Sequence, residues 1–233
     1  MTRILFPAFL LLFLGCSAAE RESPTRGNLT LLASESLAPL MNQEAFEFHR
    51  IYPGINVTVL PALTREAIVA LFTDTIKAAA TDRPLNEEEL SVMTSAKLPI
   101  METKIGEDAL VVLVNRKNGL SQLSLTDLGR ILSGGITHWD QIPSSRRKGS
   151  IQLSLTKRNS GIYELLEKHF FKLERGINIQ APTTSQEAVI EEVKRNPSTL
   201  GIVSFSFFKS VGVAAASTLR PLQIAGQPDS GKG

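Results

Sequence analysis

Three loop-to-helix junctions carry residues that suit the binding of an oxyanion. They lie at residues 33–37, 80–85 and 158–161. Each places hydroxyl groups and backbone N–H groups just beyond an expected strand, where the N-terminus of the next helix offers unpaired N–H donors and partial positive charge. In open α/β sheets the ligand lies in the crevice beyond the carboxyl ends of the strands. The three junctions together therefore predict an anion site.

Each junction taken alone also has a purely structural interpretation. Ser36 and Ser160 are residue types that cap helix N-termini, and Asp82 is a common turn former. Arg83 and Arg158 are the candidates to offset the charge of an anion, or they pair with Asp82 and nearby glutamates instead. Because the three junctions are spread over both halves of the chain, we favour the site.

Arrangements that would support catalysis are nearly absent from the sequence. His49, His138 and His169 are scattered and lack the spacing of metal ligands. Residues 145–148 match the pattern S-x-x-K, but they lie in a polar loop with no helix behind them. An enzyme on a similar scaffold would need a nucleophile–base pair, and the sequence offers none. We therefore expect a binding protein with no catalytic residue, no metal and no cofactor.

The first 16 residues are typical of an export signal. A positive residue precedes an apolar run at residues 4–14, which is too short to span a bilayer, and Gly15-Cys16 follows. The single cysteine in this position resembles the acylated cysteine of bacterial lipoproteins. We expect lipidation of Cys16 and a periplasmic or cell-envelope location, with the membrane contacted only through the lipid. An ordinary signal peptide cleaved nearby is the alternative.

Composition describes the rest of the chain. Residues 17–27 are polar and read as a tether, and about 205 residues remain, enough for one large domain or two small lobes. The hydrophobic content of 42% indicates a packed core, and a net charge of +2 does not suggest nucleic acid. The basic cluster at residues 146–148 is expected to be a solvated loop.

Strand and helix patterns alternate almost throughout. Apolar strands are expected at residues 28–33, 55–60, 76–80, 108–115, 151–155 and 200–205. Amphipathic helices are expected at residues 36–49, from 64 onward, and at 87–91, 124–133, 160–172 and 185–195. Thr64 and Asn86 are expected to cap two of these helices. The βαβα order predicts an α/β fold with mostly parallel sheets flanked by helices.

Two lobes fit this order better than a single sheet, which is the alternative. The apolar run at residues 108–115 is long enough to pass from one lobe to the other. We expect the first lobe to consist of residues 28–109 plus 207–233, and the second lobe of residues 110–206.

The order of segments resembles the phosphate-binding protein of bacterial phosphate ABC transporters, especially its shorter lipoprotein relatives. The resemblance covers about residues 28–207 and rests on LLASESLAPL (31–40), AAATDRPLNEEEL (78–90), LTDLGRILSGGITHWDQI (125–142), RNSGIYELL (158–166) and NPSTLGIVSFSF (196–207). It implies a two-lobed periplasmic-binding-protein-like fold of type II, joined by a strand hinge. It also implies an oxyanion, phosphate first, held in an interlobe cleft for an ABC permease. Trp139 is expected to pack a lobe.

The resemblance further implies which residues hold the anion. They come from three loops: Ser34, Ser36 and the backbone N–H of Leu37 from the first, Thr81, Asp82 and Arg83 from the second, and Arg158, Ser160 and Gly161 from the third. In this reading Asp82 accepts a hydrogen bond from protonated phosphate and so discriminates against sulfate.

The chain departs from the family pattern in the third loop and at its end. Thr156 stands where the family has an arginine, Ile162 replaces a threonine, and residues 61–63 replace a glycine-rich turn. The chain also stops soon after the second expected crossing. These departures favour an alternative, a degenerate paralogue that serves as a sensor or assembly module and no longer binds phosphate.

Overall fold

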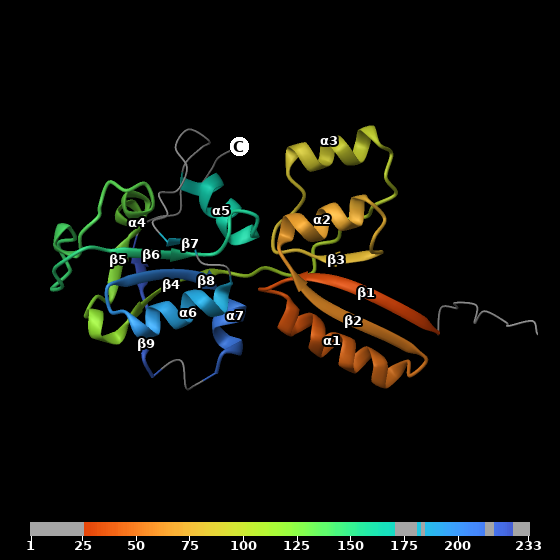
Figure 1. Ribbon diagram of the computed structural model, residues 1–233, viewed down its shortest axis with the longest axis horizontal. Helices are drawn as coiled ribbons and strands as arrows, with labels where there is room; N and C mark the ends of the chain where they lie inside the picture. Colours follow the sequence, from red (N-terminus) through yellow and green to blue (C-terminus); the bar gives the residue numbers. More distant parts are fainter. Residues whose placement is uncertain (1–25, 171–180, 183–184, 213–216, 226–233) are drawn as a thin grey trace, which may run out of the picture.

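The structure is a computed structural model of the 233-residue chain, and it describes residues 26–170, 181–182, 185–212 and 217–225. The expected export signal, Cys16 and nearly all of the tether lie outside the described residues. Within them the chain forms two α/β lobes joined by a single extended crossing at residues 98–109 (Figure 1). Among the described helices none is long and apolar enough to span a membrane.

The first lobe is a small parallel sheet with helices on both faces (Figure 1). Its elements are β1 (Gly27–Ser34), α1 (Ala38–Ile51), β2 (Ile55–Ala62), α2 (Thr64–Phe72), β3 (Ala78–Ala80) and α3 (Glu87–Ser95). The strand order is β2-β1-β3, and Ala33 pairs with both Pro61 and Ala80. The carboxyl ends of the three strands therefore meet at one edge of the sheet.

The second lobe contains a larger mixed sheet. Its elements are β4 (Leu110–Asn115), β5 (Gln122–Ser124), α4 (Leu125–Leu132), β6 (Gln152–Leu155), α5 (Gly161–Phe170), β7 (Ala181–Pro182), α6 (Gln186–Arg195), β8 (Thr199–Ser204), α7 (Phe205–Ser210), β9 (Leu219–Pro221) and β10 (Gln223–Ala225). The five-stranded order is β7-β6-β8-β4-β9, and β10 pairs with β5. Strands β6, β7 and β8 run parallel, and β4 runs antiparallel to β8 and β9. Helices α4 and α5 lie on one face and α6 and α7 on the other (Figure 1).

Local signals in the sequence explain where several helices begin and end. Asn86 and Glu89 form the two halves of a capping box at the start of α3, as expected for an Asn three residues before a Glu. The side chain of Ser124 accepts the N–H of Asp127 at the start of α4. Gly134, two residues after the end of that helix, adopts a φ of 77°, a conformation that favours glycine and ends the helix.

Most of the hydrophobic core lies in the second lobe. Trp139 and Tyr163 are fully buried there, together with Leu132 and Leu155. The indole Nε1 of Trp139 donates to the carbonyl of Ser198 at 3.1 Å, so this residue packs the lobe, as expected. The core of the first lobe is small by comparison and is centred on three alanines, Ala33, Ala38 and Ala80.

The expected lobe boundaries need correction at two places. The first lobe is expected to include residues 207–233, but α7 packs on the second lobe, β9 pairs with β4 and β10 pairs with β5, both in the second lobe. The segment 219–225 lies on the second lobe because Leu219 packs in the apolar cluster formed by β4, α6 and β8. Strand β4 is a central strand of the second sheet, and the crossing consists of the mostly exposed residues before it.

A glycine in β8 allows α6 to lie directly on the second sheet. A Cβ atom added to Gly201 would lie 2.6 Å from Val193 Cγ2 and 2.7 Å from Val189 Cγ1. Both valines are fully buried and stiff at χ1, so they cannot turn away. Gly201→Ala is expected to lower the free energy of unfolding by about 1–3 kcal/mol, measured by urea denaturation. Adding Val193→Ala should recover part of this loss, and an additive further loss would contradict the explanation.

Candidate functional site

The carboxylate of Asp82 is the centre of a hydrogen-bonded group at the edge where β1, β2 and β3 end. Ser36 Oγ donates to Asp82 Oδ2 at 3.0 Å, and Thr64 Oγ1 donates to Asp82 Oδ1 at 2.6 Å. Ser36 and Thr64 are buried, and each follows the end of a parallel strand by two residues. The first and second of the three predicted loops therefore meet at Asp82.

The third predicted loop reaches the same carboxylate from the second lobe. A Cβ atom added to Gly161, the first residue of α5, would lie 1.9 Å from Asp82 Oδ1. Only a residue without a side chain permits so close an approach. The N-terminus of a ten-residue helix thus faces a group of negative charge, which the helix dipole favours.

Ser160, directly before Gly161, has a structural role that the sequence left open. Its Oγ accepts the backbone N–H of Tyr163 at 3.2 Å, as a helix cap does, and shares a 2.5 Å hydrogen bond with Thr156 Oγ1. Thr156 is 1% exposed and occupies the position of the family arginine. Ile162 packs into the core of the second lobe, so the family threonine is replaced by a core residue here.

A fourth contribution comes from α6, the end of β8 and the first turn of α7. Gln186 Nε2 donates to Ser36 Oγ at 3.0 Å, and Gln186 Oε1 accepts the N–H of Ser204 at 2.7 Å. The hydroxyl of Ser206 lies 3.1 Å from the carbonyl oxygen of Ser36 and 2.5 Å from Asp108 Oδ2. The second lobe therefore contacts both the side chain and the backbone carbonyl of Ser36.

Glu35 is next to Ser36 in the first lobe, and its carboxylate contacts the second lobe. Its Oε2 accepts the N–H of Gln186 at 3.0 Å, at the N-terminus of α6. Burial raises the pKa of Glu35 above its ordinary value. The hydrogen bond from Gln186 opposes this increase, while the negative charges of Asp82 and Glu187 add to it and Lys157 opposes it. The region around Ser36 is thus rich in acceptors and negative charge.

Arg83 forms a buried ion-pair cluster with Glu89 and Glu164. Its side chain is 5% exposed and makes two hydrogen bonds to Glu89, at 2.7 and 2.9 Å, and its Nε contacts Glu164 on α5. Burial alone would lower the pKa of Arg83, but the two glutamates outweigh it and raise that pKa. Of the two roles left open by the sequence, pairing with glutamates is the one in the structure, and the cluster joins the lobes.

The remaining predicted residues lie around the site without entering its hydrogen-bond network. The N–H of Leu37 donates to the carbonyl of Ser34 at 2.9 Å, within a turn. Thr81 Oγ1 donates to the carbonyl of Arg83 at 2.8 Å, also within its own turn. Ser34 is buried, and its Oγ has no partner among the described residues. Arg158 is exposed beside Tyr163. Burial, with the charge of Glu167, raises the pKa of Tyr163 above its ordinary value, and the charge of Arg158 opposes part of this increase.

Two site residues were missed from the sequence. Thr64 was expected to cap α2, but Leu63 holds the N-cap position and the Thr64 side chain turns to Asp82. Its place just after a strand was the signal that could have identified it. Gln186 follows the helix cap Ser185 and carries no sequence signal of its own, because its partner Ser36 is 150 residues away.

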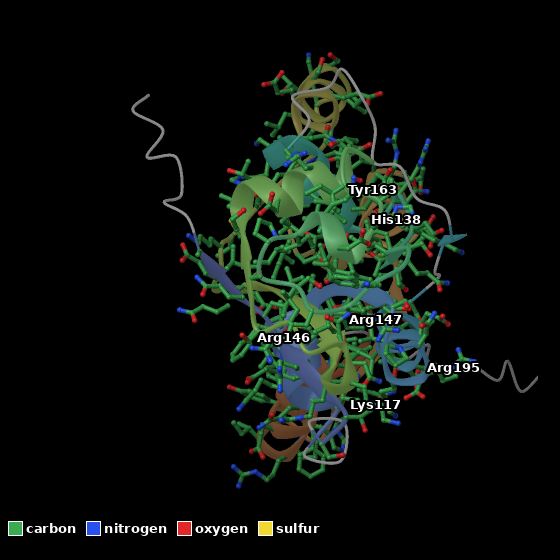
Figure 2. All side chains as sticks on the ribbon, turned by 90° about the vertical axis from the view of Figure 1, so that its left-hand side faces the viewer. Lys117, His138, Arg146, Arg147, Tyr163 and Arg195 are labelled. Atoms are coloured by element: carbon green, nitrogen blue, oxygen red, sulfur yellow. The ribbon has the colours of Figure 1, made fainter. Side chains whose placement is uncertain are left out.

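His138 and the basic cluster at residues 146–148 lie apart from this site. Figure 2 views the molecule from the end remote from the first lobe and labels His138, Arg146 and Arg147 there. Arg147 donates to Ser198 Oγ at 2.9 Å, and Arg146 is exposed. Within the described residues no three His, Cys, Asp or Glu side chains are grouped to hold a metal ion.

Comparisons with known proteins are consistent with this geometry. A family model described as a PBP superfamily domain matches residues 18–231. Protein SphX of Synechococcus elongatus is 22% identical over 194 residues, which cover 82% of this chain and 58% of that protein. The phosphate-binding protein PstS of Borreliella burgdorferi is 24% identical over 182 residues, which cover 76% of this chain and 63% of that protein. The chain thus spans less than two thirds of each relative.

A solved structure shares the fold. A Clostridium perfringens protein with bound phosphate, described as a candidate phosphate ABC transporter substrate-binding protein, has a TM-score of 0.71 at 18% identity. The match covers 85% of this chain and 76% of that chain. The expected two-lobed α/β architecture of the periplasmic binding proteins is thereby confirmed, and the single-sheet alternative is excluded.

Proposed function

The chain belongs to the PBP superfamily, and from that premise we propose that it is a binding protein whose lobes hold an oxyanion, with phosphate the first candidate. The observation that carries the proposal is the meeting of three strand ends and the N-terminus of α5 around Ser36, Thr64 and Asp82. A helix N-terminus suits an oxyanion, and the two hydroxyls hold the carboxylate that would accept from a protonated one. The names of the relatives and of the structural neighbour support phosphate as that oxyanion.

The site would recognise its ligand by hydrogen bonding more than by a paired guanidinium. Arg83 is held by Glu89 and Glu164, and Thr156 stands at the position of the family arginine. The N–H groups at the start of α5 would then replace part of the water shell of the anion, and Asp82, held by the hydroxyls of Ser36 and Thr64, would accept a hydrogen bond from a protonated anion. The lobes would close on the ligand about the crossing, since the crossing is extended and mostly exposed.

The cellular role follows as a further part of the proposal. The lipidation of Cys16 expected from the sequence would hold the protein on a cell-envelope membrane, and an ABC permease would receive the anion from it. This role involves binding without chemistry. Mass spectrometry of the native N-terminus would detect a diacylated Cys16, and an unmodified thiol would exclude the lipid anchor.

One observation favours a second candidate function. In the third loop the family arginine is replaced by Thr156, whose hydroxyl is engaged with Ser160 at 2.5 Å. A degenerate paralogue acting as a sensor or assembly module would retain the fold and lack anion affinity. A titration with phosphate separates the two candidates.

The carboxylate of Asp82 is expected to discriminate phosphate from sulfate. At neutral pH phosphate still carries a proton that it can donate, whereas sulfate can only accept and would face a like charge. A carboxylate that faces sulfate without a hydrogen bond costs on the order of 1–3 kcal/mol. We therefore expect a roughly tenfold to hundredfold preference for phosphate. Asp82→Asn should narrow this gap, because an amide can donate to sulfate.

Calorimetric titration of both anions measures the ratio of their affinities. Asp140→Asn is the matched control, because Asp140 is exposed on the second lobe and the change in charge is the same. If Asp82 only forms a turn, its substitution lowers stability and leaves the affinity ratio unchanged. That outcome would remove Asp82 from the site.

A further inference from the structure

The buried side chain of Gln186 joins the two lobes through hydrogen bonds whose direction is fixed. Gln186 is 1% exposed and begins α6. Its Oε1 lies 2.7 Å from the backbone nitrogen of Ser204, and its Nε2 lies 3.0 Å from Ser36 Oγ. Because a backbone N–H can only donate, the amide oxygen must face Ser204 and the amide nitrogen must face Ser36.

This direction determines the role of the Ser36 hydroxyl. The amide of Gln186 donates to one lone pair of Ser36 Oγ, so the hydroxyl proton must point elsewhere. It points to Asp82, 3.0 Å away, while Thr64 donates to the other oxygen of that carboxylate. A series of hydrogen bonds therefore runs from the N–H of Ser204 through Gln186 and Ser36 to Asp82, and each group donates to the next.

We propose that Gln186 is a positioning residue of the oxyanion site, which holds the hydroxyl of Ser36 as a donor on the Asp82 side. The inference rests on the proposed function and deepens it. With the amide in place, the acceptor capacity that Asp82 keeps is available to a ligand that carries a proton. An acceptor in place of the donor at position 186 would draw the Ser36 hydroxyl away from Asp82, and a missing donor would leave that hydroxyl without its fixed orientation. Either change would weaken the capture of that ligand.

The charges around Gln186 make this role testable by pH. Charged groups from each neighbouring element surround Ser36 and Gln186: Glu35 and Asp82 from the first lobe, Asp108 from the crossing, Lys157 before α5, and Glu187 on α6. Negative groups predominate. A carboxyl group introduced at position 186 is therefore expected to have a raised pKa and to take up a proton under mildly acidic conditions.

The substitution Gln186→Glu changes the donor and little else. It keeps the shape and the oxygen that accepts from Ser204, but it replaces the N–H donor by an acceptor. At pH 7.5 the Ser36 hydroxyl should turn to the introduced carboxylate, and phosphate affinity measured by calorimetry should fall at least about tenfold, which corresponds to one lost hydrogen bond to a charged group. At pH 5 the protonated carboxyl donates as the amide did, so the loss relative to wild type at the same pH should shrink to less than about threefold.

Two control variants define the comparison. Gln43→Glu adds the same charge on the exposed side of α1 and is expected to match wild type at both pH values. Gln186→Met fills the same space but offers no donor at any pH, so its loss of affinity should persist at pH 5. Only the glutamate variant is expected to recover upon acidification.

The outcomes separate this inference from the proposed function. Wild-type affinity in Gln186→Glu at pH 7.5, or a loss that persists at pH 5, would overturn the positioning role while phosphate binding stands. Failure of the wild type to bind phosphate would overturn the function, and the role of Gln186 toward phosphate with it. The urea midpoint without phosphate then still reports the hydrogen-bond direction, since it should fall in Gln186→Glu at pH 7.5 and recover at pH 5.

Discussion

Replacement of Arg83 by methionine is expected to lower the free energy of unfolding by about 3–5 kcal/mol, because it leaves two partly buried carboxylates without their cation. The side chains of Arg83, Glu89 and Glu164 are 5, 11 and 22% exposed, so water cannot fully replace the lost guanidinium. Methionine keeps much of the packing of the arginine stem. Urea denaturation followed by far-UV circular dichroism measures the loss.

An exposed ion pair provides the control for Arg83. Arg50 pairs with Glu47 at 2.9 Å on α1, where the two side chains are 70 and 47% exposed. Arg50→Met should change stability by no more than about 1 kcal/mol. Combining Arg83→Met with Glu164→Gln should cost less than the sum of the two single changes, since they share one interaction. Equal effects at positions 50 and 83 would contradict a buried interlobe cluster.

The same cluster gives the stability a dependence on pH. Burial would raise the pKa of Glu89, but hydrogen bonds from Arg83 and from the backbone of Asn86, with the charge of Arg83, lower it below the ordinary 4.5. The folded carboxylate therefore holds its proton less tightly than the unfolded one. The contribution of the Glu89 carboxylate to stability is fully present above about pH 4.5, and it is lost as the pH falls through the lower pKa of the folded state. The difference in the free energy of unfolding between wild type and Arg83→Met should become smaller in that acidic range.

Gly161→Ala is expected to have the second largest effect, and to act on the contact between the lobes. The added methyl group would lie 1.9 Å from Asp82 Oδ1 and 2.6 Å from Asp82 Cγ, distances that no packed atoms adopt. Asp82 cannot move aside without losing the hydroxyls of Ser36 and Thr64. The start of α5 must then withdraw from the first lobe, and a phosphate held between them would lose its helix N-terminus.

We expect Gly161→Ala to reduce phosphate affinity at least about tenfold and to lower the free energy of unfolding by about 1–3 kcal/mol. Calorimetry measures the first effect, and small-angle scattering should show a larger radius of gyration. Gly106→Ala is the matched control, because a Cβ atom there meets nothing within 4 Å. A compact Gly161→Ala variant with wild-type affinity would show that α5 and Asp82 do not meet in solution.

The elements of this fold were largely predictable because their apolar periodicity is strong and their ends carry local signals. The run at Leu110–Asn115 is an apolar strand, and Asn86 and Glu89 mark the start of α3. The lobe to which β9 and β10 belong could not be predicted in this way. Their short strands fit either sheet by sequence, and the choice depends on which edge is free in the folded lobe.

The site was predictable only as far as local loops define it. Ser36, Asp82 and Gly161 follow strand ends or begin a helix, and the structure brings them together. Gln186 and the Glu164 partner of Arg83 could not be assigned, because their roles depend on contacts 150 and 81 residues away along the chain. A polar side chain buried by such a contact looks in the sequence like one on a solvated surface.

Titration of inorganic phosphate into the purified chain is the most direct test of the central claim that the two lobes hold an oxyanion. We expect saturable binding at pH 7.5 with one phosphate per chain, and weaker binding of sulfate. Absence of a binding isotherm for both anions, with the chain folded by circular dichroism, would contradict it and favour a fold retained for sensing or assembly.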